Sequence, residues 1–170
     1  QLVSAPSATC CGALRYHLND QAGGLNNAKQ NIDAWWPMVE SGIEAIIMTA
    51  SGCGVMVKDY GHLLANDPAY AAKAKRISEL TKDISEVMAS LQNELVALIG
   101  ADQKPGVVYH PPCTLQHGQQ IRGKVEGLLG SLGIGVRLCN DSHLCCGSAG
   151  TYSVTQPELS EQLRNNKLKN

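Results

Sequence analysis

Two Cys-Cys-Gly sequences, at residues 10–12 and 145–147, carry four of the seven cysteines of this chain. Neighbouring cysteines lie about 3.8 Å apart at Cα, whereas an unstrained disulfide prefers about 5.5–6 Å. A chain of 170 residues, 44% of them hydrophobic, can bury a core without disulfide staples. The odd number of cysteines and their pairing therefore favour reduced thiols, metal ligation or redox chemistry over a disulfide framework.

The composition excludes several classes of protein. The formal net charge of -1 argues against a nucleic-acid-binding domain, which is usually basic. The sequence has no apolar run of about 18 residues, so no membrane-spanning helix is expected, and it shows no signal-peptide pattern. It contains neither a GxGxxG sequence nor a P-loop, which leaves nucleotide binding without support. Because residue 1 is Gln, the chain is expected to be a fragment or a processed product.

Helical and strand patterns alternate along the chain, which predicts an α/β fold with parallel strands. Cys53 and Cys113 each come just after a predicted strand, where open α/β sheets bind ligands. The apolar run at residues 2–6 is expected to be the end of a further strand. Strands are predicted at 43–49, 107–110 and 133–138, and helices at 25–40, 55–64, 69–99, 119–132 and 157–168.

The chain also contains an internal repeat. A shift of 135 residues places Cys10-Cys11-Gly12 on Cys145-Cys146-Gly147, lays 25–40 over the last helix and overlays Asn31 on Asn166. Under this shift, the positions that would correspond to Cys53 and Cys113 fall outside the chain. The prediction is two related Rossmann-like units with parallel strands and flanking helices, truncated at both ends. The first would span residues 1–100, with a long helical segment, and the second residues 101–170.

Each predicted unit holds three of an expected four repeat-related cysteines. Thiolates are soft ligands that select iron–sulfur clusters, zinc or copper(I), and four of them suit a [4Fe-4S] centre or a tetrahedral zinc. The spacing does not choose between these groups. Free cysteine is also a common buried residue, which is the favoured interpretation for Cys139, inside a strand pattern and outside the repeat. The candidate ligands are Cys10, Cys11 and Cys53 in one unit and Cys113, Cys145 and Cys146 in the other.

Three histidines flank the second set of cysteines, at His110, His117 and His143. A histidine near a ligand can bind the metal or donate a hydrogen bond to a cluster sulfur, which raises the reduction potential. A polar loop residue satisfied by its neighbours is the favoured alternative to ligation. The three are therefore candidates for the shell of residues behind the ligands.

These features resemble the cysteine-rich CCG domain, which occurs twice in one of the subunits of heterodisulfide reductase and in iron–sulfur subunits of flavin-linked 2-hydroxyacid dehydrogenases. The likeness covers essentially the whole chain. Longer strings resemble the bacterial glycolate oxidase iron–sulfur subunits, at residues 10–18, 31–37, 50–54, 110–117 and 141–152.

The resemblance implies an electron-transfer role. Such a subunit passes electrons from a flavin subunit, which oxidises glycolate to glyoxylate, towards the respiratory quinone pool. The chain would be a C-terminal piece without the family's ferredoxin-like part. The intact protein would hold [4Fe-4S] clusters at the six cysteines. The alternative for this piece is that it holds zinc or no metal. The chain would be a non-catalytic component partnered by flavin-containing subunits, cytoplasmic, with any attachment to the inner face of the bacterial membrane made through partners.

One departure from the family pattern concerns Met56, which stands where heterodisulfide reductase has the second cysteine of a CxxC sequence. A thioether there argues against a five-cysteine cluster with disulfide-cleaving chemistry, so a thiol–disulfide reductase is the least favoured alternative. The other alternative to electron transfer is a structural docking module, in which the cysteines bind zinc or no metal. Missing strands would expose sheet edges, so dimerisation by edge pairing or swapping is expected.

Overall fold

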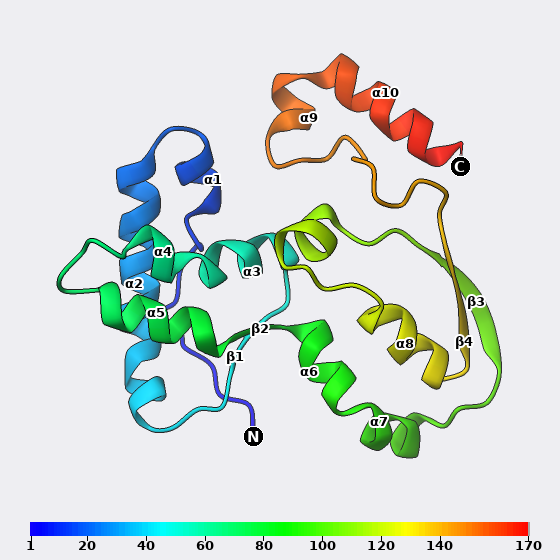
Figure 1. The fold of residues 1–170 in the computed structure, drawn as a ribbon, viewed down its shortest axis with the longest axis horizontal. Helices are drawn as coiled ribbons and strands as arrows, with labels where there is room; N and C mark the ends of the chain where they lie inside the picture. Colours follow the sequence, from blue (N-terminus) through cyan, green and yellow to red (C-terminus); the bar gives the residue numbers. More distant parts are fainter. Residues whose placement is uncertain (170) are drawn as a thin grey trace. The chain divides into compact units, whose positions relative to one another are not determined.

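The computed structural model describes residues 1–169, so Asn170, the last residue of the second predicted unit, lies outside the described residues. The predicted α/β class is confirmed, because helices alternate with two parallel two-stranded sheets (Figure 1). The chain divides into two compact units, with the boundary between Ile84 and Ser85. Within residues 1–169 no helix combines the length and the apolar character needed to cross a bilayer.

The first unit holds a short parallel sheet between helices. Strands β1 and β2 pair in parallel, with Ile46 opposite Thr81 and Met48 opposite Asp83. The strand expected at residues 2–6 is wrong: the segment has no strand partner in the described chain, and Leu2 and Val3 are exposed. The elements are α1 (Ala13–His17), α2 (Gln21–Glu40), β1 (Ile46–Met48), α3 (Ser51–Lys58), α4 (Tyr60–Leu63), α5 (Ala71–Leu80) and β2 (Thr81–Asp83).

The helical segment expected at 69–99 is interrupted by β2, after which α6 (Ile84–Ser90) and α7 (Gln92–Ile99) follow. Helix α5 ends at Leu80, and the hydroxyl of Thr81 donates to the Ile77 carbonyl at 2.7 Å. Thr81 and Asp83 are buried in the strand although both are polar. Pairing with β1 therefore overrides the helical pattern for three residues.

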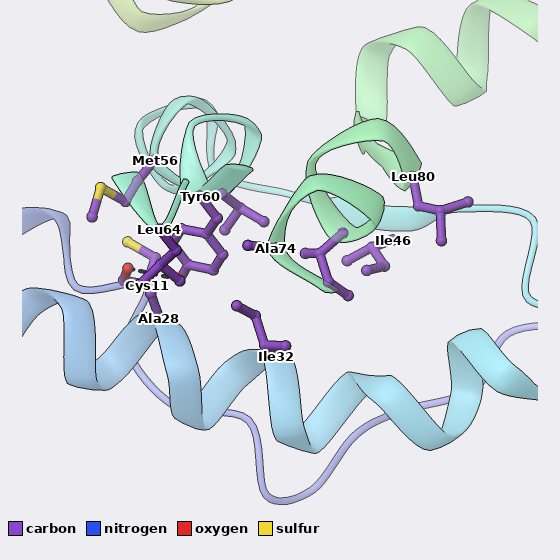
Figure 2. Close-up of a cluster of buried hydrophobic side chains, with 11 residues drawn as sticks. Cys11, Ala28, Ile32, Ile46, Met56, Tyr60, Leu64, Ala74 and Leu80 are labelled. Atoms are coloured by element: carbon purple, nitrogen blue, oxygen red, sulfur yellow. Dashed lines mark hydrogen bonds between the residues drawn. The ribbon is translucent and has the colours of Figure 1, made fainter. Parts of the chain in front are cut away.

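The core of the first unit lies between α2 and the helices that follow β1 (Figure 2). Ile32 of α2, Tyr60 of α4 and Ile77 of α5 are each 0% exposed. Full burial of one such side chain contributes about 1.5–3 kcal/mol. The side chain of Cys11 joins this cluster, so one of the candidate ligands is anchored in the core rather than on a mobile loop.

The second unit holds the other sheet, in which β3 and β4 are parallel and Tyr109 lies opposite Leu138. Val107 and Val108 of β3 are exposed, and both strands are sheet edges among the described residues. Dimerisation by edge pairing therefore stays a prediction, which a concentration-independent monomer mass would contradict. Its elements are β3 (Lys104–Tyr109), the π-helix η1 (Thr114–Gly118), α8 (Lys124–Ser131), β4 (Ile134–Leu138), α9 (Tyr152–Thr155) and α10 (Pro157–Leu168).

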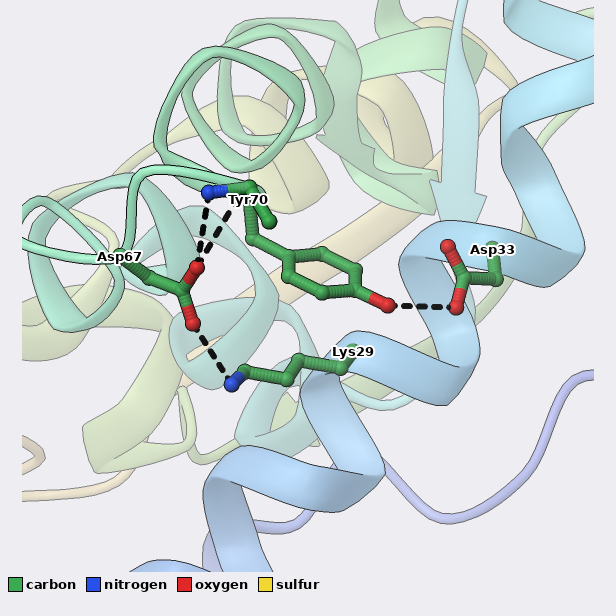
Figure 3. A network of polar contacts seen from close by, with 5 residues as sticks. Lys29, Asp33, Asp67 and Tyr70 are labelled. Carbon is green, nitrogen blue, oxygen red and sulfur yellow. Dashed lines mark hydrogen bonds and ion pairs between the residues drawn. The ribbon is translucent and has the colours of Figure 1, made fainter.

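A surface network ties α2 to the turn that precedes α5 (Figure 3). Lys29 Nζ lies 2.6 Å from Asp67 Oδ2, and Asp67 Oδ1 accepts hydrogen bonds from the backbone N–H groups of Ala69 and Tyr70. The Tyr70 hydroxyl donates to Asp33 Oδ2 at 2.7 Å. The network therefore fixes the turn to α2 from two sides.

Substitution of Asp67 by asparagine should remove part of the acid sensitivity of the first unit. The hydrogen bond from Lys29 and those from the backbone of Ala69 and Tyr70 lower the pKa of Asp67 below its ordinary value. A carboxylate with a depressed pKa stabilises the fold above its unfolded-state pKa, and this stabilisation is lost as pH falls through the folded-state value. Urea midpoints at pH 7 and pH 3 should differ less in Asp67→Asn than in the parent, and equal differences would contradict this role.

Candidate functional site

The first CCG turn lies directly against α2. Gly12 has φ of 87°, in the left-handed region, and a Cβ there would overlap the carbonyl oxygen of Gly24. Glycine enters this region without the penalty that other L-residues meet, and its lack of a side chain permits the close approach. The glycine of the Cys-Cys-Gly sequence therefore packs the backbone of the turn closely onto the helix.

The second CCG turn repeats this geometry. Gly147 also has φ of 87°, and a Cβ there would overlap the carbonyl oxygen of Ser160 in α10. The Ser160 hydroxyl donates to the Gly147 carbonyl at 2.7 Å. The two turns are thus built alike, each packed on a helix that follows it in the chain.

The contacts correct the register of the repeat beyond the turns. Gly12 and Gly147 are 135 residues apart, whereas their contact partners Gly24 and Ser160 are 136 apart. The extra residue lies between the second turn and Ser160. By these contacts Asn31 corresponds to Lys167, so the predicted overlay of Asn31 on Asn166 is wrong by one residue.

The structure gathers the three thiols of the first unit from the CCG turn and from α3. Cys10 is exposed, Cys11 is 7% exposed, and Cys53 lies in the first turn of α3 rather than in a loop. Burial raises the pKa of Cys11 to about 12, and the neighbouring thiols of Cys53 and Cys10 add to the rise, while the Ala13 backbone N–H opposes it. The Cys11 thiol is therefore protonated at neutral pH until a positively charged ligand takes the place of its proton.

Two buried polar residues, which sequence reasoning did not select, fix the backbone of this turn. The Tyr60 hydroxyl donates to the Cys11 carbonyl at 2.8 Å, and the Asn31 amide donates to the Cys10 carbonyl at 3.0 Å. Asn31 also donates to the Tyr60 oxygen at 3.3 Å and accepts from the Thr9 backbone N–H at 2.7 Å. An asparagine at a helix position flanked by core residues was the only signal in the sequence that could have identified this pair.

Replacement of Tyr60 by phenylalanine should destabilise the first unit by about 1–3 kcal/mol, the cost of leaving buried hydrogen-bonding groups unpaired. The matched control is Tyr70→Phe, because the Tyr70 hydroxyl bonds the exposed Asp33 and its loss should cost about 0.5 kcal/mol or less. Urea unfolding measures both changes. Equal effects of the two substitutions would contradict the buried role of Tyr60.

The second unit brings its three thiols together from the segments that follow β3 and β4. Cys113 precedes η1, Cys145 is exposed, and the Gly147 backbone N–H donates to Cys145 Sγ at 3.3 Å. Burial and the neighbouring Cys145 and Cys146 raise the pKa of Cys113, which the positive charge of Lys167 opposes. Cys145 and Cys146 therefore lie close enough to Cys113 to influence its pKa, and the assignment of the three as ligands stays a prediction.

Side chains from η1 and α10 hold the loop before the second CCG turn. Gln116 donates to the carbonyl of Ser142 at 2.9 Å, and His117 Nε2 lies 3.0 Å from the carbonyl oxygen of His143. Lys167 donates to the carbonyl of Asp141. The side chain of His117 therefore positions this loop, while that of His143 is exposed.

His110 and Cys139 meet at the carboxyl end of the second sheet. Cys139, predicted inside a strand, lies one residue beyond the end of β4, and its Sγ is 3.5 Å from His110 Nδ1. The other ring nitrogen, Nε2, is buried and has no hydrogen-bond partner among residues 1–169. Burial, and then the charge of Lys167, lowers the pKa of His110. A buried ring nitrogen without a partner, three residues before Cys113, fits a bound group with acceptor or metal character.

Each unit offers three thiols and no carboxylate among its candidate ligands. Ligands of this soft type are the ones that iron–sulfur clusters, zinc and copper(I) prefer. In the described part of the chain, no three Cys, His, Asp or Glu side chains are already arranged around one metal position. Met56 is 4% exposed and packs in the core.

The sequence is similar to that of several known proteins. The family model of the cysteine-rich domain CCG matches residues 1–58 and 107–170. The chain is 52% identical to the glycolate oxidase iron-sulfur subunit of Escherichia coli (strain K12), over 98% of this chain and 40% of the relative. It is 32% identical to the probable glycolate oxidase iron-sulfur subunit of Bacillus subtilis (strain 168), over 98% of this chain and 37% of the relative.

A third relative, lactate utilization protein A of Geobacillus thermodenitrificans (strain NG80-2), is 30% identical over 98% of this chain and 67% of the relative. No solved structure matches. The chain spans about two fifths of the length of the two glycolate oxidase relatives. Both segments matched by the family model contain one of the two CCG turns. The chain therefore belongs to the CCG cysteine-rich domain family.

Proposed function

We propose that the chain is an electron-transfer component whose two cysteine sites bind iron–sulfur centres. Cys10, Cys11 and Cys53 would hold one centre, and Cys113, Cys145 and Cys146 the other, with [4Fe-4S] as the expected cluster. The observation that carries the proposal is the double construction of the site: two glycine turns of equal φ each present two cysteines next to a third from a separate segment. The iron–sulfur relatives support the same chemistry.

The same construction supports two related CCG units. The compact division between Ile84 and Ser85 falls at the start of α6, so α7 lies in the second compact unit. We propose that residues 1–100 nevertheless belong to the first copy of the repeat and residues 101–170 to the second. The two separate segments matched by the family model, 1–58 and 107–170, fall on either side of this boundary.

The substrate of the complex would be a 2-hydroxyacid, and glycolate is favoured because the 52% identical relative is a glycolate oxidase subunit. Oxidation of glycolate to glyoxylate releases two electrons and two protons, which a flavin-containing partner subunit would accept. This chain would then pass the electrons, one at a time, towards the respiratory chain, in the cytoplasm at the inner face of the membrane. A bound cluster supplies the one-electron carrier in this scheme.

The chain's own residues bind and shield the group. The CCG turns place the thiols, the core around Cys11 excludes water from one side, and the Asn31–Tyr60 pair fixes the turn's backbone. In the second unit, His110 Nε2, which is unpartnered among residues 1–169, would form a hydrogen bond with the bound group. His117 would position the loop before the CCG turn through its contact with the His143 carbonyl. Burial around a cluster sets its solvent exposure and hence its potential.

The function is tested in the assembled complex by the double variant Cys113→Ser/Cys145→Ser. Glycolate-driven reduction of a quinone analogue should be lost, because serine is a poor substitute for a soft thiolate ligand. Cys139→Ser is the matched control and should retain the rate, since Cys139 lies outside both ligand sets. Full electron transfer in the double variant would instead support a structural docking module.

A further inference from the structure

Each unit contains a buried side-chain carboxamide that bonds the backbone next to its cysteines. Asn31 is 1% exposed and Gln116 is 6% exposed, whereas both residue types are mostly found at protein surfaces. A buried polar group is retained only where its hydrogen bonds are made, so both amides have a structural task.

In the first unit, the carboxamide of Asn31 and the hydroxyl of Tyr60 together bind three consecutive residues of the chain. Asn31 accepts from the Thr9 N–H and donates to the Cys10 carbonyl. Tyr60 donates to the Cys11 carbonyl, and both of these residues are labelled in Figure 2. The two side chains come from α2 and α4 and are joined by the hydrogen bond between them. Both peptide groups that follow the paired cysteines are thereby fixed from the core.

In the second unit, one amide nitrogen spans the two segments that carry cysteines. Gln116 Nε2 donates to the Pro111 carbonyl at 2.8 Å and to the Ser142 carbonyl at 2.9 Å. Pro111 precedes Cys113 by two residues, and Ser142 precedes Cys145 by three. The amide therefore sets the separation of the two segments whose thiols must meet.

If the backbone around the cysteines became ordered only when metal binds, the conformational entropy lost in that ordering would weaken binding. A backbone that is already ordered avoids this loss. We propose that Asn31 and Gln116 are positioning residues that order the backbone of the two cysteine sites before any metal binds, although the thiols themselves, all within residues 1–169, are not yet arranged around one metal position. The proposal rests on the proposed function, in that the thiols are taken as ligands of the centres. The units use different positions for this purpose, because the counterpart of Asn31 by the helix contacts is Lys167.

The test measures alkylation of each cysteine by iodoacetamide in the protein at its natural length, freed of metal under reducing conditions and read by peptide mass spectrometry. In Asn31→Ala the reaction of Cys11 should quicken about ten-fold or more, because losing buried hydrogen bonds raises the population of open turns by that order. Cys113 and Cys146 should keep their parental rates. Gln116→Ala should show the reverse pattern, so each variant controls the other, and Asn26→Ala, at an exposed position of the same helix as Asn31, should change neither set.

Tyr60→Phe provides a milder variant if Asn31→Ala does not fold, because its ring still fills the core. This variant should speed up the alkylation of Cys11 alone. Rates of Cys11 that remain parental in Asn31→Ala and Tyr60→Phe overturn the proposal. So does a uniform rise at all six cysteines in either variant, because that pattern reports a general loss of stability. Absence of iron and sulfide from the parent protein would overturn the proposed function instead, and would leave the unit-specific alkylation pattern intact.

Discussion

Gly12→Ala is expected to destabilise the first unit by roughly 2–5 kcal/mol, from left-handed backbone strain of about 1–2 kcal/mol and an overpacking cost of about 1–3 kcal/mol. The strain arises because Gly12 has φ of 87°, and the overpacking because a methyl group would overlap the Gly24 carbonyl. Neither cost can be relieved without moving the CCG turn away from α2. Against a typical domain stability of about 5–15 kcal/mol, this is a large fraction.

The matched control separates the two costs. Gly42 has φ of 90° but nothing within 4 Å of its Cβ position, so Gly42→Ala should cost only the strain of about 1–2 kcal/mol. Gly147→Ala should resemble Gly12→Ala, because it meets the Ser160 carbonyl in the same way. Denaturant unfolding of the parent and the three variants measures these differences. A Gly12→Ala variant no less stable than Gly42→Ala would show that the turn does not depend on close packing against the helix.

Single cysteine substitutions should each remove one centre from the protein. Cys53→Ser is expected to lose the iron of the first site and to keep that of the second, and Cys113→Ser should do the opposite. The reason is that each substitution replaces a soft thiolate by a hard hydroxyl in a set of three. Iron and acid-labile sulfide analysis, with electron paramagnetic resonance of the reduced protein, measures the loss.

Cys139→Ser is the control for both variants, since it removes a thiol that neighbours His110 but belongs to neither set. Its iron content should equal that of the parent. Unchanged iron in Cys53→Ser and Cys113→Ser together would contradict the assignment of the six cysteines as ligands.

The sequence predicted the α/β class and several elements, because the helices after the CCG turns and the strands before Cys53 and Cys113 have clear periodicity or compact apolar runs. It missed β2, whose residues Thr81, Lys82 and Asp83 have no apolar pattern. That strand exists because β1 offers backbone partners and because the Thr81 hydroxyl bonds the end of the preceding helix. Pairing of this kind depends on distant residues, which local propensity does not register.

The candidate ligands were visible in the sequence because cysteine repeats are rare, whereas the residues that support them were not. Asn31, Tyr60 and Gln116 act through their burial and through carbonyl groups that lie up to 49 residues away in sequence. Apart from the core positions that flank Asn31 in its helix, nothing in the sequence distinguishes such a role from a surface position. The one-residue shift between Asn31 and its counterpart likewise required the helix contacts.

The central claim is that the six cysteines bind iron–sulfur centres. It is tested most directly by the iron, zinc and acid-labile sulfide content of the anaerobically purified protein at its natural length, compared with a variant in which all six are serine. The parent is expected to hold iron and matching sulfide in excess of the variant. Zinc in that excess, or no difference in metal between the two proteins, would contradict it.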